Sequence, residues 1–122
     1  MGVLDGLKVL DFSTLFPGPY ATMVLADMGA EVLRVSSKSR TDIVLEAPPR
    51  IPGTEINAGA ATITRNKKSI SLNLKHPEAV KIVHKLVREY DIIVDQFRPG
   101  VMDRMGIGYE ALRVENPALI YC

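Results

Sequence analysis

The segment 7–35, LKVLDFSTLFPGPYATMVLADMGAEVLRV, has the pattern of a strand, a tight turn, a helix and a second strand. Residues 8–12 form a short, mostly apolar run, which is typical of a strand covered by helices on both faces. The Pro-Gly-Pro sequence at 17–19 suits the start of a helix, because proline lacks an N–H group that the first turn would leave unpaired. A helix over about 19–28 between two strands predicts a right-handed parallel crossover.

The same segment lacks the G-x-G-x-x-G sequence that such a unit carries when it binds a dinucleotide. Its turn is built from two prolines around one glycine instead. The pattern therefore indicates a nucleotide-binding type of fold that uses different phosphate chemistry. The ligand has to be inferred from the rest of the chain.

Further strands and helices are predicted after residue 63. The segment 68–74 alternates, with Ile70, Leu72 and Leu74 on one face, which is typical of a half-exposed strand. The other predicted elements are a helix from 76 to about 90, a strand within 91–97, short helices over 101–105 and 109–114, and a strand over 118–122. The chain therefore predicts an α/β fold, a Rossmann-like open parallel sheet of about five strands with flanking helices, in a single domain of residues 1–122.

The segment 36–63 is predicted to be an irregular, mobile loop. It carries three of the eight prolines and shows no sustained periodicity. A short helix around 57–62 is the one regular element that we expect within it.

Composition predicts a soluble, cytoplasmic protein. The 122 residues suffice for one domain with a core, and 47% hydrophobic with 24% charged residues is typical of a globular chain. No apolar run approaches the ~18 residues of a membrane-spanning helix. The N-terminus does not resemble a signal peptide, and the single cysteine, Cys122, excludes an intramolecular disulfide and fits a reducing compartment.

Basic residues are concentrated in the middle of the chain. The segment 34–68 holds seven basic and three acidic residues, although the net charge of the whole chain is only +1. Lys38 and Arg40 follow the second predicted strand, at the edge of the sheet where ligands of open parallel sheets bind. They are candidates to meet a phosphate, and a solvated loop with scattered charge is an equal alternative.

Residues with catalytic spacing are scarce. His76 is expected to start a helix, His84 borders the apolar stripe of that helix, and no cluster has metal-ligand spacing. Asp11 and Asp95 weakly resemble a phosphoacceptor pocket, but the other acids of such a pocket are missing. No G-x-S-x-G sequence provides a serine nucleophile. We therefore predict no catalytic and no metal-binding residue in this chain.

Three blocks of the sequence resemble the family III CoA-transferases (CaiB/BaiF type), which include α-methylacyl-CoA racemase and carnitine-CoA transferases. The blocks are LDGLKVLDFSTLFPGPYATMVLADMGAEVLRV at 4–35, RNKKSISLNLKHPE at 65–78 and DQFRPGVMDRMGIGYEALRVENPALIYC at 95–122. They follow the order and spacing of the family and cover almost the whole chain. Asn66 stands where the family usually has glycine, and asparagine also tolerates a left-handed backbone.

The resemblance implies that this part of the chain holds coenzyme A (CoA). It places the pantetheine arm near the first turn, adenine and phosphates near the exit of the third strand, and further contacts after the fourth strand. The residues that match these positions are Leu15 and Phe16; Leu72, Leu74 and Lys75; Gln96, Phe97 and Arg98; and Arg104. The chemistry is compatible, because the phosphates of CoA require Lys or Arg donors and adenine requires an apolar shelf.

Each of these assignments has a simpler alternative. Leu72 and Leu74 could pack in the core without touching a ligand, and Arg98 and Arg104 could be ordinary surface arginines. Family members often have an acid and then arginine or proline after the second strand, where this chain has Ser36 and Ser37. That difference leaves Lys38 or Arg40 to meet the phosphate.

The resemblance also implies that the catalytic residues of the family lie beyond Cys122. We therefore expect this chain to be the N-terminal part of a larger enzyme and to be inactive alone. The substrate would be CoA or an acyl-CoA, with no covalently bound cofactor. The enzyme would transfer CoA between carboxylic acids or racemise an α-methylacyl-CoA, and the sequence of 16–27 is more similar to the racemase branch.

Other classes of function remain open. The domain could be a non-catalytic module that binds CoA or another nucleotide, or that serves in assembly. Lys38 and Arg40 could instead read the 2′-phosphate of NADP, although the glycine loop is missing. Nucleic acid is not an expected partner, because the basic segment lacks interleaved aromatic residues. We expect no membrane contact, and a homodimer or self-association through exposed apolar surface or the terminal strand.

Overall fold

The computed structural model describes residues 2–37 and 42–122, so Lys38 and Arg40 lie outside the described residues. Its centre is a parallel sheet with the strand order β3-β2-β1-β4-β5. The strands are β1 (Lys8–Asp11), β2 (Glu31–Ser36), β3 (Lys67–Ser71), β4 (Ile92–Val94) and β5 (Ile120–Tyr121). The predicted fold class, an open parallel sheet of five strands with flanking helices, is confirmed.

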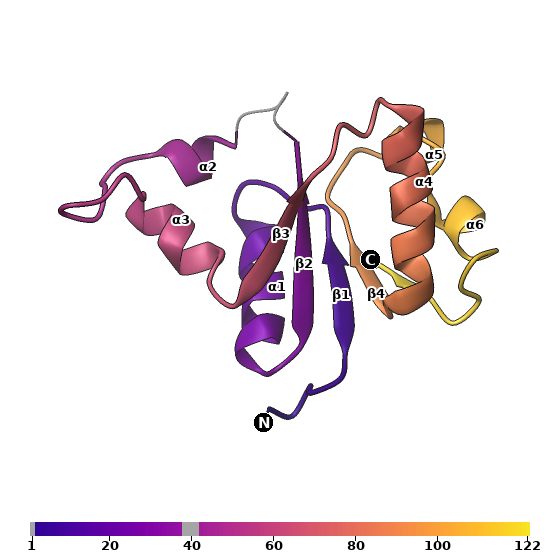
Figure 1. The fold of residues 1–122 in the computed structure, drawn as a ribbon, viewed down its shortest axis with the longest axis horizontal. Coiled ribbons are helices and arrows are strands. Elements are labelled where there is room, and N and C mark those ends of the chain that lie inside the picture. The colour runs from indigo at the N-terminus through magenta and orange to yellow at the C-terminus, as the bar shows by residue number, and fades with distance from the viewer. Residues whose placement is uncertain (1, 38–41) are drawn as a thin grey trace.

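Helices lie on both sides of this sheet (Figure 1). They are α1 (Pro17–Asp27), α2 (Ile43–Glu46), α3 (Ala58–Ile63), α4 (Pro77–Leu86) with the 3₁₀ turn η1 (Val87–Glu89), α5 (Val101–Arg104) and α6 (Tyr109–Leu112). The segment 42–63 thus contains two short helices: α3 matches the helix expected near 57–62, and α2 was not expected. The long helix is α-helical only to Leu86, and η1 completes the span that was predicted to reach residue 90.

The chain reverses its direction across the sheet after β3. From the central strand β1 it moves outward to β2 and β3, and then returns to the other side of β1 for β4 and β5. Asp11, the last residue of β1, is in register with Arg34 of β2 and Val94 of β4. The loops that follow these three strands therefore emerge at one edge, at the point where an open α/β sheet forms its ligand-binding crevice.

The two faces of the sheet bury separate hydrophobic clusters. The larger cluster lies beneath α4 and the α5–α6 segment, and its fully buried side chains include Leu10, Phe12, Val83, Ile93 and Leu112. The smaller cluster lies beneath α1 and consists of Val9, Ala26, Ala30 and Val32. Successive residues of one strand point to opposite faces, which explains why the short apolar runs of the sequence fill both clusters.

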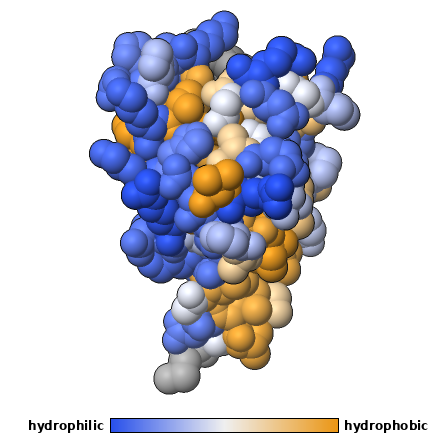
Figure 2. All heavy atoms as spheres, turned by 90° about the vertical axis from the view of Figure 1, so that its right-hand side faces the viewer, coloured by the Kyte–Doolittle hydropathy of each residue, from blue (hydrophilic) through white to orange (hydrophobic). Residues whose placement is uncertain are grey.

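The outer surface on the side of α4, α5 and α6 is mostly hydrophilic (Figure 2). Hydrophobic atoms appear there mainly toward the lower end, near the N-terminal residues. This distribution agrees with helix α4, which buries Ala79 and Val83 and exposes Glu78, Lys81 and Lys85. Within the described residues, no helix has both the length and the apolar character needed to cross a membrane.

The turn between β1 and α1 is closely packed at Gly18. Pro17 and Pro19 flank this glycine in the first turn of α1, which begins two residues earlier than the sequence predicts. A Cβ atom on Gly18 would lie 2.3 Å from Ser13 Cβ and 2.9 Å from Gln96 Oε1. The absence of a side chain at Gly18 therefore lets α1 approach the exits of both β1 and β4.

We expect Gly18→Ala to lower the free energy of unfolding by about 1–3 kcal/mol, because the added methyl group must displace Ser13. Urea denaturation measures this change. Gly59→Ala is the matched control, since it adds the same methyl group inside α3, where the nearest atom would be the Val44 carbonyl oxygen at 3.4 Å. Alanine is the better helix former, so stability at Gly59 should be unchanged or higher. Equal losses at both positions would contradict the packing argument.

Candidate functional site

A groove of about 690 Å³ lies over the carboxyl ends of the strands. Its described lining comes from the loops after β1, β2, β3 and β4 and from α5. These residues are Thr14, Leu15, Ser37, Asn73, Leu74, Lys75, Gln96, Phe97, Arg98, Val101 and Met105. Among them are two cations, Lys75 and Arg98, and no acidic side chain, while four aliphatic side chains and Phe97 supply apolar surface. The groove therefore suits an anion that carries an apolar portion.

A second pocket of about 290 Å³ adjoins the groove and shares four lining residues with it. The shared residues are Thr14, Ser37, Leu74 and Phe97. Its other described lining residues are Phe12, Arg34, Val35, Ser36, Asp42, Leu45 and Glu46. Helix α2 contributes Leu45 and Glu46, so the segment that the sequence predicts as an irregular loop forms part of this pocket's wall.

Six of the eleven residues predicted for the site line the groove together. They are Leu15, Leu74, Lys75, Gln96, Phe97 and Arg98. They come from three loops that are far apart in the sequence, and the strand order brings these loops to one edge. The structure thus gives these six residues a common location.

The other predicted residues lie elsewhere. Leu72 is 8% exposed and packs in the larger hydrophobic cluster. Phe16 is 55% exposed and stacks on Tyr20 with 5.6 Å between ring centroids, outside the groove lining. Arg104 is on α5 but is not among the residues that line the groove. Lys38 and Arg40 belong to the segment outside the described residues.

The wall of the groove after β4 is held by hydrogen bonds to two neighbouring segments. Gln96 Nε2 donates to Thr14 Oγ1 over 3.0 Å, which joins the exits of β4 and β1. The Phe97 N–H donates to Asp95 Oδ1 over 2.7 Å, and the Tyr121 hydroxyl donates to Asp95 Oδ2 over 2.9 Å. Burial beside this carboxylate raises the pKa of Tyr121, so the hydroxyl keeps its proton at physiological pH. Strand β5 thereby fixes the turn that carries Gln96 and Phe97.

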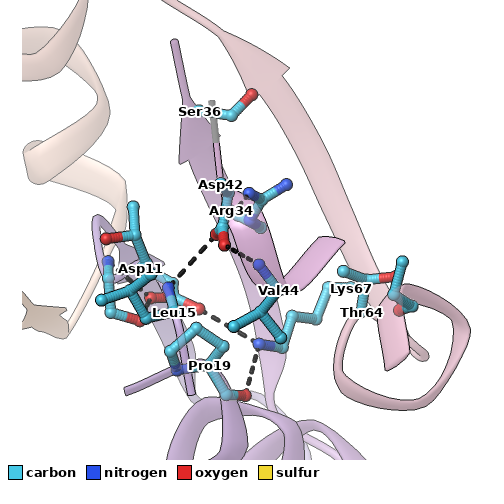
Figure 3. A network of polar contacts seen from close by, with 12 residues as sticks. Asp11, Leu15, Pro19, Arg34, Ser36, Asp42, Val44, Thr64 and Lys67 are labelled. Carbon is cyan, nitrogen blue, oxygen red and sulfur yellow. Dashed lines mark hydrogen bonds and ion pairs between the residues drawn. The ribbon is translucent and has the colours of Figure 1, made fainter. Parts of the chain in front are cut away.

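A buried polar network lies beneath the β1–α1 turn (Figure 3). Its centre is Asp11, which is fully buried at the end of β1. Oδ1 accepts the Ser13 N–H over 2.9 Å and the Ser13 hydroxyl, and Oδ2 accepts the Thr22 hydroxyl. Lys67 Nζ lies 3.2 Å from the same Oδ2. Four donors therefore surround the carboxylate, which satisfies the acceptor capacity of an ionised, buried acid.

Lys67 closes this network from β3. Its side chain is 1% exposed, and Nζ donates to the Pro19 carbonyl oxygen over 2.8 Å and to Thr22 Oγ1 over 2.7 Å. Burial lowers the pKa of Lys67 below its ordinary value, and the adjacent Asp11 carboxylate opposes that shift. The pair connects β1, α1 and β3, so it fixes the Pro-Gly-Pro turn relative to the sheet. Sequence reasoning missed this pair, because nothing in the sequence distinguishes the buried Lys67 from the exposed Lys68.

A second buried carboxylate, Asp42, lies on the other side of the turn (Figure 3). Asp42 is 9% exposed and accepts the Leu15 N–H over 3.2 Å and the Val44 N–H over 3.2 Å. Arg34 Nη2 lies 3.6 Å from Asp42 Oδ2. The sequence signal for Asp42 was its position before an apolar run, which is typical of a helix N-cap. Its contact with Leu15 had no signal in the sequence.

The two histidines lie away from the groove lining. His76 caps α4, because its Nδ1 accepts the Glu78 N–H over 3.2 Å, as expected for a residue at a helix start. His84 contacts the Gly106 carbonyl oxygen and Glu115. Among the described residues, no group of three His, Cys, Asp or Glu side chains is placed to hold a metal ion.

The strand order and the groove at the point where it reverses define a doubly wound α/β domain with a binding crevice. The sequence model of CoA-transferase family III matches residues 4–122. The chain therefore belongs to CoA-transferase family III, and the resemblance carried by the three sequence blocks is confirmed.

Curated relatives and solved structures agree with this assignment. The chain is 40% identical to human succinyl-CoA:glutarate CoA-transferase, with 98% of this chain and 27% of the relative covered. It is also 40% identical to succinyl-CoA:mesaconate CoA-transferase of Haloarcula marismortui, with 99% and 31% covered. A CaiB/BaiF family protein from Brucella suis superimposes with a TM-score of 0.89 at 34% identity, with 99% and 32% covered. The chain thus spans about a third or less of these proteins.

We expect Lys67→Met to lower the free energy of unfolding by about 3–5 kcal/mol, because it leaves the Asp11 carboxylate buried without its cation. The double variant Asp11→Asn with Lys67→Met should recover part of that loss, since the amide carries no charge and can donate to Thr22 Oγ1. Urea denaturation of the single and double variants measures both effects.

Lys68→Met is the matched control. Lys68 is the next residue of β3, and its ion pair with Glu31 is exposed to solvent. An exposed pair contributes little, so Lys68→Met should change stability far less than Lys67→Met. A large loss for both variants, or none for Lys67→Met, would show that the buried pair does not hold the turn.

Proposed function

We propose that this chain forms the CoA-binding lobe of an enzyme that transfers CoA between carboxylic acids. The observation that supports the proposal is the convergence of Leu15, Leu74, Lys75, Gln96, Phe97 and Arg98 on one groove. These residues were predicted from the family resemblance, and they come from three separate loops. The identity of the chain to CoA-transferases acting on succinyl-CoA supports transfer rather than racemisation.

The chemistry of the groove matches the parts of CoA. Lys75 and Arg98 carry the positive charge that a phosphate or pyrophosphate requires, and no acidic side chain of the described lining opposes them. Phe97, Val101 and Met105 provide apolar surface for adenine or for the pantetheine arm. We infer that phosphate contacts are made by side chains, because the β1–α1 turn has the Pro-Gly-Pro sequence in place of a glycine loop.

The nucleophile of the reaction is proposed to come from outside residues 1–122. In CoA transfer the enzyme carboxylate attacks the thioester, forming a mixed anhydride with the donor acyl group and releasing the CoA thiolate. The thiolate attacks the enzyme carbonyl of that anhydride, which releases the donor acid and leaves an enzyme–CoA thioester. The acceptor carboxylate attacks this thioester to form a second anhydride and release the thiolate, which attacks the acceptor carbonyl and frees the enzyme carboxylate. Asp42 and Asp95, two acids beside the groove, are already engaged by backbone N–H groups and by Arg34 or Tyr121. This chain would therefore bind and orient the thioester and would not turn it over alone.

Two further properties accompany this proposal. We propose a cytoplasmic location, because the one cysteine of residues 1–122 is a free thiol, which suits a reducing compartment. We also propose that residues 1–122 self-associate, because β5 lies at an edge of the described sheet and its Ile120 is 54% exposed.

Isothermal titration with CoA tests the binding proposal. Arg98→Ala and Lys75→Ala should each weaken CoA binding by about tenfold, because each removes a charge-assisted contact to phosphate. Arg113→Ala is the matched control, since Arg113 is an exposed arginine on the surface that pairs with Glu110 and does not line the groove. The affinity of the Arg113→Ala variant for CoA should equal that of the unchanged protein.

Competing ligands make the same titration decisive. Binding of CoA without binding of NADPH would support the CoA proposal over the alternative in which the domain binds the 2′-phosphate of NADP. Failure of the unchanged protein to bind CoA would contradict the proposal, and so would equal losses of affinity for Arg98→Ala and Arg113→Ala. Turnover of an acyl-CoA by residues 1–122 alone would contradict the external origin of the nucleophile.

A further inference from the structure

Three segments meet at the carboxylate of Asp42. Oδ2 accepts the Leu15 N–H of the β1–α1 turn over 3.2 Å, and Oδ1 accepts the Val44 N–H at the start of α2 over 3.2 Å. Arg34 of β2 lies 3.6 Å away and neutralises the charge. Figure 3 shows the Asp42 side chain pointing toward Leu15 and Val44 with Arg34 beside it. We propose that Asp42 is a positioning residue that holds Leu15 and the β1–α1 turn, which form the lip of the CoA groove.

Leu15 needs such support because of its backbone. Its φ angle is +64°, in the left-handed region that side-chain-bearing residues other than Asn and Asp rarely adopt. This conformation persists only where the surroundings hold it. The Asp42 carboxylate, which is 9% exposed, accepts a charge-assisted hydrogen bond from the N–H of this residue. Leu15 is thereby held as part of the groove lining.

The same carboxylate fixes the wall of the adjoining pocket. It caps α2, whose residues Leu45 and Glu46 line that pocket together with Asp42 itself. The two cavities share Thr14, the residue that precedes Leu15. One side chain therefore sets the relative positions of the turn and of α2, at the place where the groove and the pocket meet. The inference rests on the proposed function, because the groove is taken to bind CoA.

The role of Asp42 predicts a specific pattern of variants in the intact protein. Asp42→Ala should weaken CoA binding by about tenfold, because the lip of the groove is no longer held before the ligand arrives. Asp42→Asn keeps one oxygen that can accept the Leu15 N–H, so it should weaken binding less than Asp42→Ala. Both are measured by isothermal titration with CoA.

A double-variant cycle separates positioning from a general loss of stability. Glycine adopts a φ of +64° without support, so Asp42→Ala should lose much of its effect on CoA affinity in a Leu15→Gly background. Asp27→Ala is the matched control, because Asp27 is the carboxylate at the opposite end of α1, where it pairs with Arg65. It should leave CoA affinity unchanged. An equal effect of Asp42→Ala in both backgrounds would overturn the proposal.

Amide hydrogen exchange, followed by NMR without ligand, tests the positioning role independently of CoA. Asp42→Ala should accelerate exchange of the Leu15 amide at least tenfold, whereas Asp27→Ala should not change it. If the unchanged protein fails to bind CoA but this acceleration is seen, the proposed function is wrong and Asp42 still holds the turn. If the Leu15 amide exchanges at the same rate with and without Asp42, the positioning role itself is refuted.

Discussion

The buried ion pair between Lys67 and Asp11 determines where the β1–α1 turn can lie. Both side chains are almost fully inaccessible to solvent, and each is costly to bury without the other. Their partners come from β1, α1 and β3, and they include the carbonyl oxygen of Pro19 within the turn. A sheet strand that is distant in the sequence thus anchors the first helix, and the lip of the groove is built on that anchor.

The groove combines this anchored turn with two neighbouring loops. Thr14 is bonded to Gln96 after β4, and Leu15 is bonded to Asp42 after β2. The turn is therefore connected on both sides at the edge where the strand order reverses. The cations Lys75 and Arg98 face the groove without an opposing acid in its described lining. Positive side chains on loops held by such hydrogen bonds are an arrangement that would favour recognition of an anion.

The sequence predicted the fold because each element carries a local signal. The apolar runs of the strands, the prolines at the starts of α1 and α4, and the charged outer surface of α4 all agree with the observed elements. Asn66 was expected to accept a left-handed backbone, and its φ is +60°. Helix α2 escaped prediction because it has only four residues, and its N-cap is the main local signal for it. Periodicity is not detectable over so few positions.

The candidate site was predictable only where the family resemblance identified residues. Lys75 and Arg98, which line the groove, could be assigned to the site in this way, whereas Lys67 and Asp42 could not. A buried lysine has the same sequence appearance as the exposed Lys68 beside it, since only the packing of α1 on β3 distinguishes them. The left-handed backbone of Leu15 also has no signal in the sequence. Leucine does not favour that conformation, and it is held there by a residue 27 positions later.

The bond between Tyr121 and Asp95 links the wall of the groove to strand β5. Asp95 shapes the turn of Gln96 and Phe97, and Tyr121 lies on β5, the short outermost strand. A groove wall supported in this way is complete only while the outermost strand is docked. By thermodynamic linkage, a ligand that binds more tightly when β5 is docked also shifts the equilibrium of β5 toward its docked position. A ligand bound in the groove would thus favour the docking of β5 beside β4.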